Sequence, residues 1–531
     1  NEVREKRTPN SAERRYQKTL SKNFTLYADY KKNFNDRHDL SVMVGTSHES
    51  ENYDRFTAKR INFDQQENMS LQLGSAQDQN AWSEGNQWTI NSFFSRVNYT
   101  FANKYVIEGT IRADGSSRFD PDHRWGWFPG VNAAWRVGEE GFMKRLGWFE
   151  DLKVRASYGE MGNQSGIGLY DYIQLISLSN DYYPFGAGVK GQMATSGNII
   201  STSRTWETIQ TTNVGFDFST LNNRLYGSFD YFWKENKNML IPKTYPSMLG
   251  ADAPSTNSGH LSIHGWEISL GWRDQIKDFS YSVRFNISDA KNKVVDRVGS
   301  NLIKLGNNET PTGYPLNSYF GYEFDGIIQN EQELEAYKSR FSEGGIPGDL
   351  SVGDAMYKDL DGDGKLSVLG DGKEGSGDVK YLGDKNPRYN FGFNLSMAWK
   401  GFDLSAFIQG VGRRTMFLEG ESRCPMPEAW YQSAEYWYGK TWTPERTDAQ
   451  YPAITLKDKR NYNYYVSTNT KFNVAYARLK NLQFGYTIPQ TLTSKAGLQK
   501  VRVYFSGEDL FEVHNTPNGW DPEENSGSIT S

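Results

Sequence analysis

The residues with the clearest chemical potential are three aspartates in the segment 359–366, which reads DLDGDGKL. Asp359, Asp361 and Asp363 match the first, third and fifth positions of a calcium-binding loop, and Gly364 matches its sixth position. Glycine permits the sharp turn that brings three carboxylates together, and the backbone carbonyl of Lys365 would be a fourth ligand. The spacing therefore predicts a bound Ca²⁺ or Mg²⁺ in this loop.

The pattern is incomplete as a helix–loop–helix calcium site. Its twelfth position, where such loops carry a bidentate glutamate, is Gly370. Asp371, Asp354 or water would have to complete the coordination shell. The alternative is a plain Asp/Gly turn that holds no ion. A metal here would brace the loop, and the sequence indicates no required cofactor.

Aromatic residues are concentrated between positions 414 and 472. Aromatic faces stack on sugar rings and also form the energetic centres of protein interfaces. The sequence therefore predicts contact with a ligand or a partner protein, and packing of the segment against the mouth of the barrel is the alternative. The candidate contact residues are Trp430, Tyr431, Tyr436, Trp437, Tyr438 and Trp442.

Several kinds of chemistry are not indicated. The net charge is −5, from 59 basic and 64 acidic residues, so nothing suggests the concentrated basic face of a nucleic-acid-binding protein. Cys424 is the single cysteine, which excludes an intramolecular disulfide and a cysteine-cluster metal site. No nucleophile elbow and no glycosidase carboxylate pair is recognisable. We do not expect an enzyme.

The elements that must position these loops are β-strands. In 93–137 apolar residues alternate with polar ones: Val97, Tyr99 and Phe101 on one face, and then Ile107 and Ile111 after a turn at 102–104. The same alternation predicts fourteen strands near 23–31, 37–50, 91–101, 104–114, 127–136, 151–160, 206–219, 223–236, 262–273, 278–291, 389–399, 402–413, 473–487 and 500–508.

The connections alternate between short and long. Tight turns are predicted around 102–103, 220–222 and 400–401, with a helical segment in 138–150. Long loops are predicted near 51–90, 161–205, 292–388 and 414–472, and a short helix is expected at 331–341. Sorting of loops by length at the two ends of the strands is typical of a transmembrane β-barrel of the outer membrane, whereas a soluble all-β protein has no reason for it.

The fold class predicted is therefore all-β, a large antiparallel transmembrane β-barrel. Apolar runs are too short for a membrane helix, and a barrel needs none because only every second residue faces lipid. Fourteen strands, with both ends of the chain appearing cut, suggest part of a barrel of about 22 strands, which requires a plug. We expect residues 1–531 to be a partial barrel domain, with the plug domain upstream of it.

The segment 94–142, FSRVNYTFANKYVIEGTIRADGSSRFDPDHRWGWFPGVNAAWRVGEEGF, resembles the barrel of SusC/RagA-type TonB-dependent outer-membrane transporters. Further segments agree in order, among them LKVRASYGEMGNQSG (152–166), GDKNPRYNFGFNLSMAWKGFDLSAFIQGVGRR (383–414) and ARLKNLQFGYTIP (477–489). The resemblance covers nearly the whole chain, and its motifs are specific as a set.

This resemblance implies an importer in the outer membrane of a Gram-negative bacterium. Such transporters take up oligosaccharides, or peptides, with a SusD-like surface lipoprotein as a lid, and the TonB complex supplies energy through an N-terminal region that this sequence lacks. The aromatic residues of 414–472 would then contact substrate or lid. Two other functions stay open: a receptor for iron chelates such as siderophores or haem, and a surface-binding barrel without energised transport.

Overall fold

The computed structural model describes residues 10–64, 69–77, 79–185, 189–196, 199–242, 248, 254–297, 306–309, 311–369, 377–427, 433–455 and 459–524. The chain divides into two compact units. Unit 1 comprises Asn1–Ala133, Tyr158–Gln210 and Asn238–Asn257, and unit 2 comprises Ala134–Ser157, Thr211–Lys237 and Ser258–Ser531. No helix among the described residues combines the length and hydropathy needed to cross a membrane.

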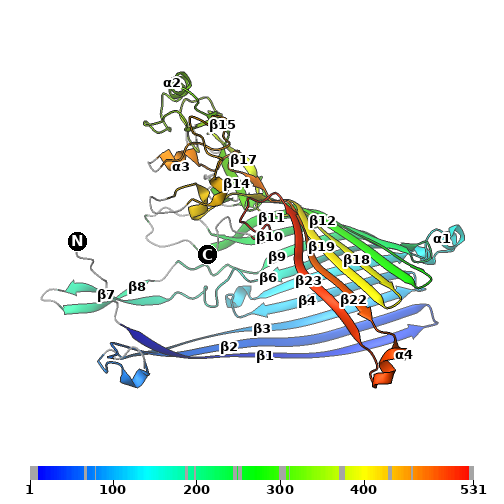
Figure 1. Cartoon of the computed structure of the whole chain (residues 1–531). Helices are drawn as coiled ribbons and strands as arrows, with labels where there is room; N and C mark the ends of the chain where they lie inside the picture. The colour runs from blue at the N-terminus through cyan, green and yellow to red at the C-terminus, as the bar shows by residue number, and fades with distance from the viewer. Residues whose placement is uncertain are drawn as a thin grey trace. The chain divides into compact units, whose positions relative to one another are not determined.

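A sheet of 14 strands dominates the fold, and its strands follow one another in chain order (Figure 1). They are β1 (Ser11–Phe34), β2 (His38–Ile61), β3 (Gln79–Phe101), β4 (Tyr105–Ser116), β5 (Trp125–Arg136), β6 (Asp151–Asn163), β9 (Glu207–Thr220), β10 (Leu225–Pro242), β11 (Ser255–Ile276), β12 (Phe279–Arg297), β18 (Arg388–Trp399), β19 (Phe402–Arg413), β22 (Tyr476–Thr487) and β23 (Arg502–His514). Each of the fourteen predicted ranges overlaps one of these strands.

Smaller elements fill the connections. The short strands are β7 (Ile176–Phe185), β8 (Val189–Ser196), β13 (Gly306–Glu309), β14 (Ser318–Tyr322), β15 (Phe324–Ile327), β16 (Ala355–Tyr357), β17 (Val379–Asp384), β20 (Thr415–Met416) and β21 (Phe472–Asn473). The helices are α1 (Gly141–Leu146), α2 (Glu331–Arg340), α3 (Lys459–Asn463) and α4 (Gln490–Thr493). The predicted helices at 138–150 and 331–341 correspond to α1 and α2.

Register within each unit explains the alternation in the sequence. In unit 1, β3 and β4 pair antiparallel with Tyr99 opposite Ile107 and Phe101 opposite Tyr105. In unit 2, β12 pairs with β18 so that Val283 faces Leu395 and Phe285 faces Phe393. Because successive side chains of a strand point to opposite faces, these pairings gather the apolar residues on one face, and serines and asparagines such as Ser396 and Asn394 on the other.

The tight turns have the expected backbone. Lys400 and Gly401 both adopt positive φ, at 45° and 91°, between β18 and β19. Ala102 and Asn103 do the same between β3 and β4, at 51° and 57°. Two consecutive residues with positive φ give a hairpin turn whose twist matches that of the strands. These turns fix the register on which the two-faced sheet depends.

The predicted loop lengths need one main correction. Most of the range 51–90 is strand, because β2 continues to Ile61 and β3 begins at Gln79, and each of them is more than 20 residues long. Within the range 161–205, β7 and β8 pair as a hairpin. The extra strand length was missed because its apolar residues do not keep a two-residue spacing: Tyr53 and Phe56 fall on opposite faces of β2, as do Ala81 and Trp82 of β3. Alternation of apolar and polar residues is the signal by which strands are recognised.

Candidate functional site

The two longest connections fold together into one body, which we call the loop module. It contains the described residues of 311–387 and 414–474, which link β12 to β18 and β19 to β22, and Figure 1 shows it beyond the ends of these strands in unit 2. Strand β14 pairs with β17 inside the first connection. The second connection then lies along β14, since Tyr322 N donates to Val466 O and Thr468 N donates to Tyr322 O.

Buried polar contacts join the two connections. Asn463 Oδ1 accepts from Ala355 N at 3.0 Å, and Asn463 Nδ2 donates to Asp354 Oδ1 at 2.8 Å. The hydroxyl of Tyr357 donates to the backbone carbonyl of Tyr462 at 2.8 Å. All five residues are buried, where an unpaired donor or acceptor is costly. The two segments therefore stabilise each other across about a hundred residues of sequence.

A cluster of aromatic rings forms the core of the loop module. Tyr357 is fully buried and Tyr462 is 2% exposed, and their ring centroids are 5.2 Å apart in an edge-on arrangement. Burial raises the pKa of both phenols well above the ordinary value, so the hydroxyls stay neutral and can donate hydrogen bonds. The aromatic content of the sequence here builds a water-excluding core.

The candidate aromatic contact residues are not all placed on a surface. Tyr436 and Trp437 are 8% and 3% exposed and belong to a second cluster, in which the Trp437 ring lies 4.9 Å from that of Tyr451. These two rings pack against other residues of the loop module, so they do not offer a contact surface. Trp430 and Tyr431 lie outside the described residues.

Among the candidates that the structure describes, Tyr438 and Trp442 retain exposed surface. The side chain of Tyr438 is 89% exposed, directly after the short turn Glu435–Trp437 that buries its neighbours. Trp442 is half-buried, and its Nε1 donates to Gln329 Oε1 of the other connection at 3.1 Å. Tyr438 is therefore the ring of this group best placed to contact a partner or a ligand.

The three aspartates of 359–363 do converge. Their carboxylate oxygens lie within 4.8 Å of one another. Asp359 accepts hydrogen bonds from Gly362 N at 2.7 Å and Gly364 N at 3.0 Å. Asp363 accepts from Lys365 N at 2.8 Å. These backbone contacts hold the loop as a turn, so the geometry fits both a cation site and the plain Asp/Gly turn, and the bound ion stays a prediction.

The proposed completing ligands are placed differently from what we expected. Asp354 is buried and accepts from Ser351 N and Asn463 Nδ2, both at 2.8 Å, so its position is set by packing. Asp371 lies outside the described residues. A further carboxylate, Asp378, contacts this loop, although the sequence analysis did not identify it. It is buried and accepts hydrogen bonds from Leu360 N and Ser367 N. Burial, and secondarily the charges of Asp361 and Asp359, raise its pKa.

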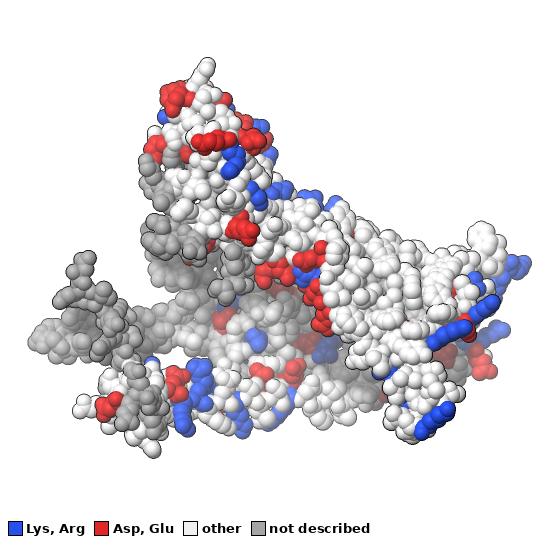
Figure 2. Space-filling model, viewed as in Figure 1, with Lys and Arg blue, Asp and Glu red and all other residues white. Residues whose placement is uncertain are grey.

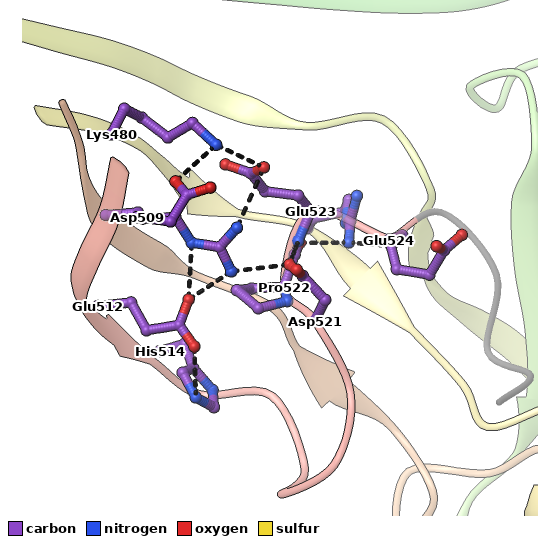
Figure 3. A network of polar contacts seen from close by, with 10 residues as sticks. Lys480, Asp509, Glu512, His514, Asp521, Pro522, Glu523 and Glu524 are labelled. Atoms are coloured by element: carbon purple, nitrogen blue, oxygen red, sulfur yellow. Dashed lines mark hydrogen bonds and ion pairs between the residues drawn. The ribbon is translucent and has the colours of Figure 1, made fainter. Parts of the chain in front are cut away.

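The chain after β23 also returns to the loop module, which we had not predicted. Trp520 is buried in the same cluster as Tyr436 and Trp437. The residues that follow it join an ion-pair network, in which Arg478 contacts Asp521 at 2.8 Å. Lys480 contacts Glu523 at 3.0 Å and Asp509 at 2.9 Å (Figure 3). Burial acts to raise the pKa of Asp521, but hydrogen bonds from Glu523 N and Arg478 lower it overall.

Comparison with known proteins gives a consistent picture. A family described as TonB dependent receptor-like, beta-barrel matches residues 3–510. TonB-dependent receptor P3 of Formosa agariphila is 32% identical over 524 residues, covering 96% of this chain and 49% of that protein. TonB-dependent receptor SusC of Bacteroides thetaiotaomicron is 27% identical over 548 residues, covering 95% of this chain and 48% of that protein.

A solved structure also matches. The structure of the RagAB peptide transporter superposes with a TM-score of 0.79 at 23% sequence identity, over 98% of this chain and 54% of that chain. At this identity the likeness shows the fold. The chain spans about half the length of the curated relatives that it matches.

Proposed function

Because the chain belongs to the TonB-dependent receptor-like β-barrel family, we propose that it forms the barrel wall and outer loops of a SusC-type importer in the outer membrane of a Gram-negative bacterium. In this proposal the apolar face of the sheet contacts lipid and the polar face lines the lumen. The cargo is an oligosaccharide or a peptide, a SusD-like lipoprotein covers the long-loop end, and TonB supplies energy through a region outside this chain.

The observation that carries the proposal is the two-faced sheet with a large folded module at one end. Half-exposed aromatic residues stand next to the tight turns of unit 2, including Trp399 at 51% and Phe402 at 41% exposure. Aromatic girdles of this kind mark the membrane interface of outer-membrane barrels. The loop module, which is connected to the opposite ends of β12, β18, β19 and β22, provides a rigid, water-exposed surface for a partner.

We favour partner contact for Tyr438. A tyrosine ring that is almost fully exposed on a rigid support is a common centre of a protein interface. Contact of Tyr438 and Trp442 with substrate is part of the same proposal. A substitution would weaken lipoprotein capture if the residue contacts the partner, and cargo binding if it contacts the substrate. A Ca²⁺ or Mg²⁺ ion bound in the loop at Asp359–Asp363 would stabilise this loop of the module and would take no part in catalysis.

The test uses the full-length transporter, extracted from native membranes in mild detergent and analysed by mass spectrometry. We expect a co-purifying surface lipoprotein and retained glycan or peptide. The variant Tyr438→Ser should weaken lipoprotein capture by about tenfold or more, the size of a typical interface hot spot. Phe142→Ser, which removes a 48%-exposed ring from helix α1 at the short-turn end, should not change capture.

A barrel that purifies without a lipoprotein and without retained cargo would contradict the proposal. Retention of an iron chelate, with production of the transporter repressed by iron, would favour the iron-chelate receptor instead. Normal lipoprotein capture with no uptake of any cargo by whole cells would favour the surface-binding barrel.

A further inference from the structure

On one face of strand β12 the side chains change from apolar to charged along the strand. Phe279, Val283 and Ile287 lie on its apolar face, and the same two-residue spacing continues through Asp289 to Lys291 and Lys293. The pairing with β11 is regular over this range, with His264 opposite Lys291. Side chains at two-residue spacing share a face, so these cationic groups stand on the face that we assign to lipid.

Distance along the strand places the lysines just beyond the apolar band. From Phe279 to Ile287 the chain advances eight residues, about 27 Å along the strand and about 21 Å along the membrane normal at a typical barrel tilt. This is close to the height of about 25 Å expected for the lipid-facing band. Lys291 is four residues further, about 10 Å above Ile287 along the normal, which is headgroup depth.

The lysines open onto a basic pocket of about 360 Å³. Its charged lining consists of five basic side chains and one carboxylate: Lys291, Lys293, Arg388, Arg413, Arg414 and Asp384. Arg388 is neutralised by a buried ion pair with Asp289, and Arg414 donates to the carbonyls of Pro522 and Glu524. The pocket lies wholly within unit 2.

Three of the basic side chains in the pocket are not neutralised by a neighbouring carboxylate that the structure describes. Within the described part of the chain, Lys291, Lys293 and Arg413 form no ion pair, and all three are exposed. Burial, and then the charges of Arg413 and Lys380, lower the pKa of the nearby Lys471, which indicates an excess of positive charge around Arg413. In Figure 2 basic and acidic side chains both lie along the border between the loop module and the largely uncharged surface of unit 2.

We propose that this basic pocket binds the phosphate headgroup of an anionic lipid in the leaflet at the long-loop end of the strands. The inference rests on the proposed function, because it needs the apolar face to be embedded in lipid. A soluble phosphate offers the same headgroup chemistry, but the apolar side chains that continue along β12 below the lysines would contact only the acyl chains of a lipid. Lysine stems lie along apolar surface while their ammonium groups reach the headgroup.

The experiment measures lipid binding to the full-length transporter by native mass spectrometry in detergent. The probes are dioleoyl phosphatidic acid and dioleoyl phosphatidylcholine at equal concentration. We expect preferential binding of phosphatidic acid, and about 30-fold weaker binding in Lys291→Gln/Lys293→Gln, from the typical contribution of each lysine at an anionic lipid surface. Lys291→Arg/Lys293→Arg should retain binding. Lys277→Gln/Lys495→Gln, an equal loss of charge at the short-turn end, should bind like the wild type.

Equal binding of the two lipids by the wild type, or an unchanged affinity in the double glutamine variant, would overturn the proposal. Displacement by inorganic phosphate at the same concentration as the lipid would show that the ligand is a soluble anion, and would also overturn it. Cargo uptake is measured separately in cells that carry the glutamine variant. Loss of lipid preference with normal uptake is the expected result, whereas a protein without cargo uptake but with lipid preference would contradict only the proposed import function.

Discussion

The loop module and the strands of unit 2 are both rich in aromatic residues, but they present them in opposite directions. In the loop module Tyr357, Tyr462 and Tyr464 are at most 2% exposed, whereas on the strands Trp399, Phe402 and Phe484 are 41–51% exposed. Aromatic rings leave water in either case, into a protein core in the module and, we propose, into lipid on the strands. The comparison teaches that composition identifies aromatic-rich segments without saying which way the rings face.

The largest expected effect is in the core of the module. Trp437→Ala removes a buried ring packed between Tyr451 and Tyr464 and should cost about 3–5 kcal/mol of module stability. Hydrogen exchange of residues 433–455 should speed up while the barrel strands stay protected. The adjacent change Tyr438→Ala, at an exposed position, should leave exchange unchanged; equal effects of the two variants would contradict the assignment of an inward and an outward ring.

The next effect separates the two faces of the sheet. Leu395→Arg places a charge on the apolar face of β18 and should destabilise the folded barrel by about 2–4 kcal/mol, the usual cost near the bilayer midplane. Asn394→Arg, one residue earlier and on the polar face, should cost far less. Equilibrium unfolding in lipid vesicles gives both values, and similar losses for the two variants would refute the two-faced sheet.

A smaller effect is expected where the two connections meet. Asn463→Ala leaves the buried Ala355 N–H without its acceptor and should cost about 1–3 kcal/mol. Faster hydrogen exchange should appear in both 318–357 and 459–474, because the contact joins them. Asn461→Ala changes an exposed residue of the same helix α3 and serves as the control. Loosening of one segment alone would show that the connections fold independently.

Calcium should act on the module and not on the strands. If the loop at Asp359–Asp363 binds Ca²⁺, a concentration ten times the dissociation constant stabilises the module by about 1.4 kcal/mol, and chelation reverses it. Asp361→Asn/Asp363→Asn should abolish the effect, and the exposed Asp448→Asn should not. Isothermal titration without heat at millimolar calcium would leave the plain Asp/Gly turn as the explanation.

The smallest effect concerns pH. Hydrogen bonds from Lys358 and Lys380 lower the pKa of Glu323 to about 2. Because the folded-state pKa lies below the ordinary value of 4.5, the contribution of this carboxylate is complete above pH 4.5 and is lost as the pH falls through about 2. Glu323→Gln should therefore lower the thermal midpoint of the module slightly at pH 7, and the difference should shrink as the pH falls from 4.5 toward 2. A difference as large at pH 2 as at pH 7 would assign the effect to packing.

Much of the sheet could be predicted because strand periodicity is a local signal. The strand at Tyr105–Ser116 is predicted by the apolar residues Ile107 and Ile111 on one face. The turn at Lys400–Gly401 is predicted by residues that tolerate positive φ. The extensions of β2 and β3 within 51–90 could not be predicted, since their apolar residues do not alternate with polar ones. The direction of Trp437 depends on Tyr451 and Tyr464, contacts that spacing does not specify.

The sequence predicted which carboxylates come together in the candidate site, but not which other residues contact them. The glycine spacing brought Asp359, Asp361 and Asp363 together as expected. Asp378 was not found, because its hydrogen bonds with Leu360 N and Ser367 N are contacts that sequence spacing does not specify. The basic pocket did leave a signal in the sequence: the two-residue alternation of β12 passes from Ile287 to Lys291 and Lys293 without a break.

The most direct test of the account is a cysteine scan along β18 in the full-length transporter in native membranes, from Phe391 to Trp399, with the buried Cys424 left in place. We predict an alternating pattern: cysteines at Phe393, Leu395 and Met397 react with a lipid-soluble maleimide, and those at Asn394 and Ser396 react with a water-soluble one. In cells that lack the lipoprotein, Tyr438→Cys should react with an impermeant reagent added outside the cell. Equal reaction of all β18 positions with the water-soluble reagent would contradict the lipid-facing assignment on which the proposed importer rests.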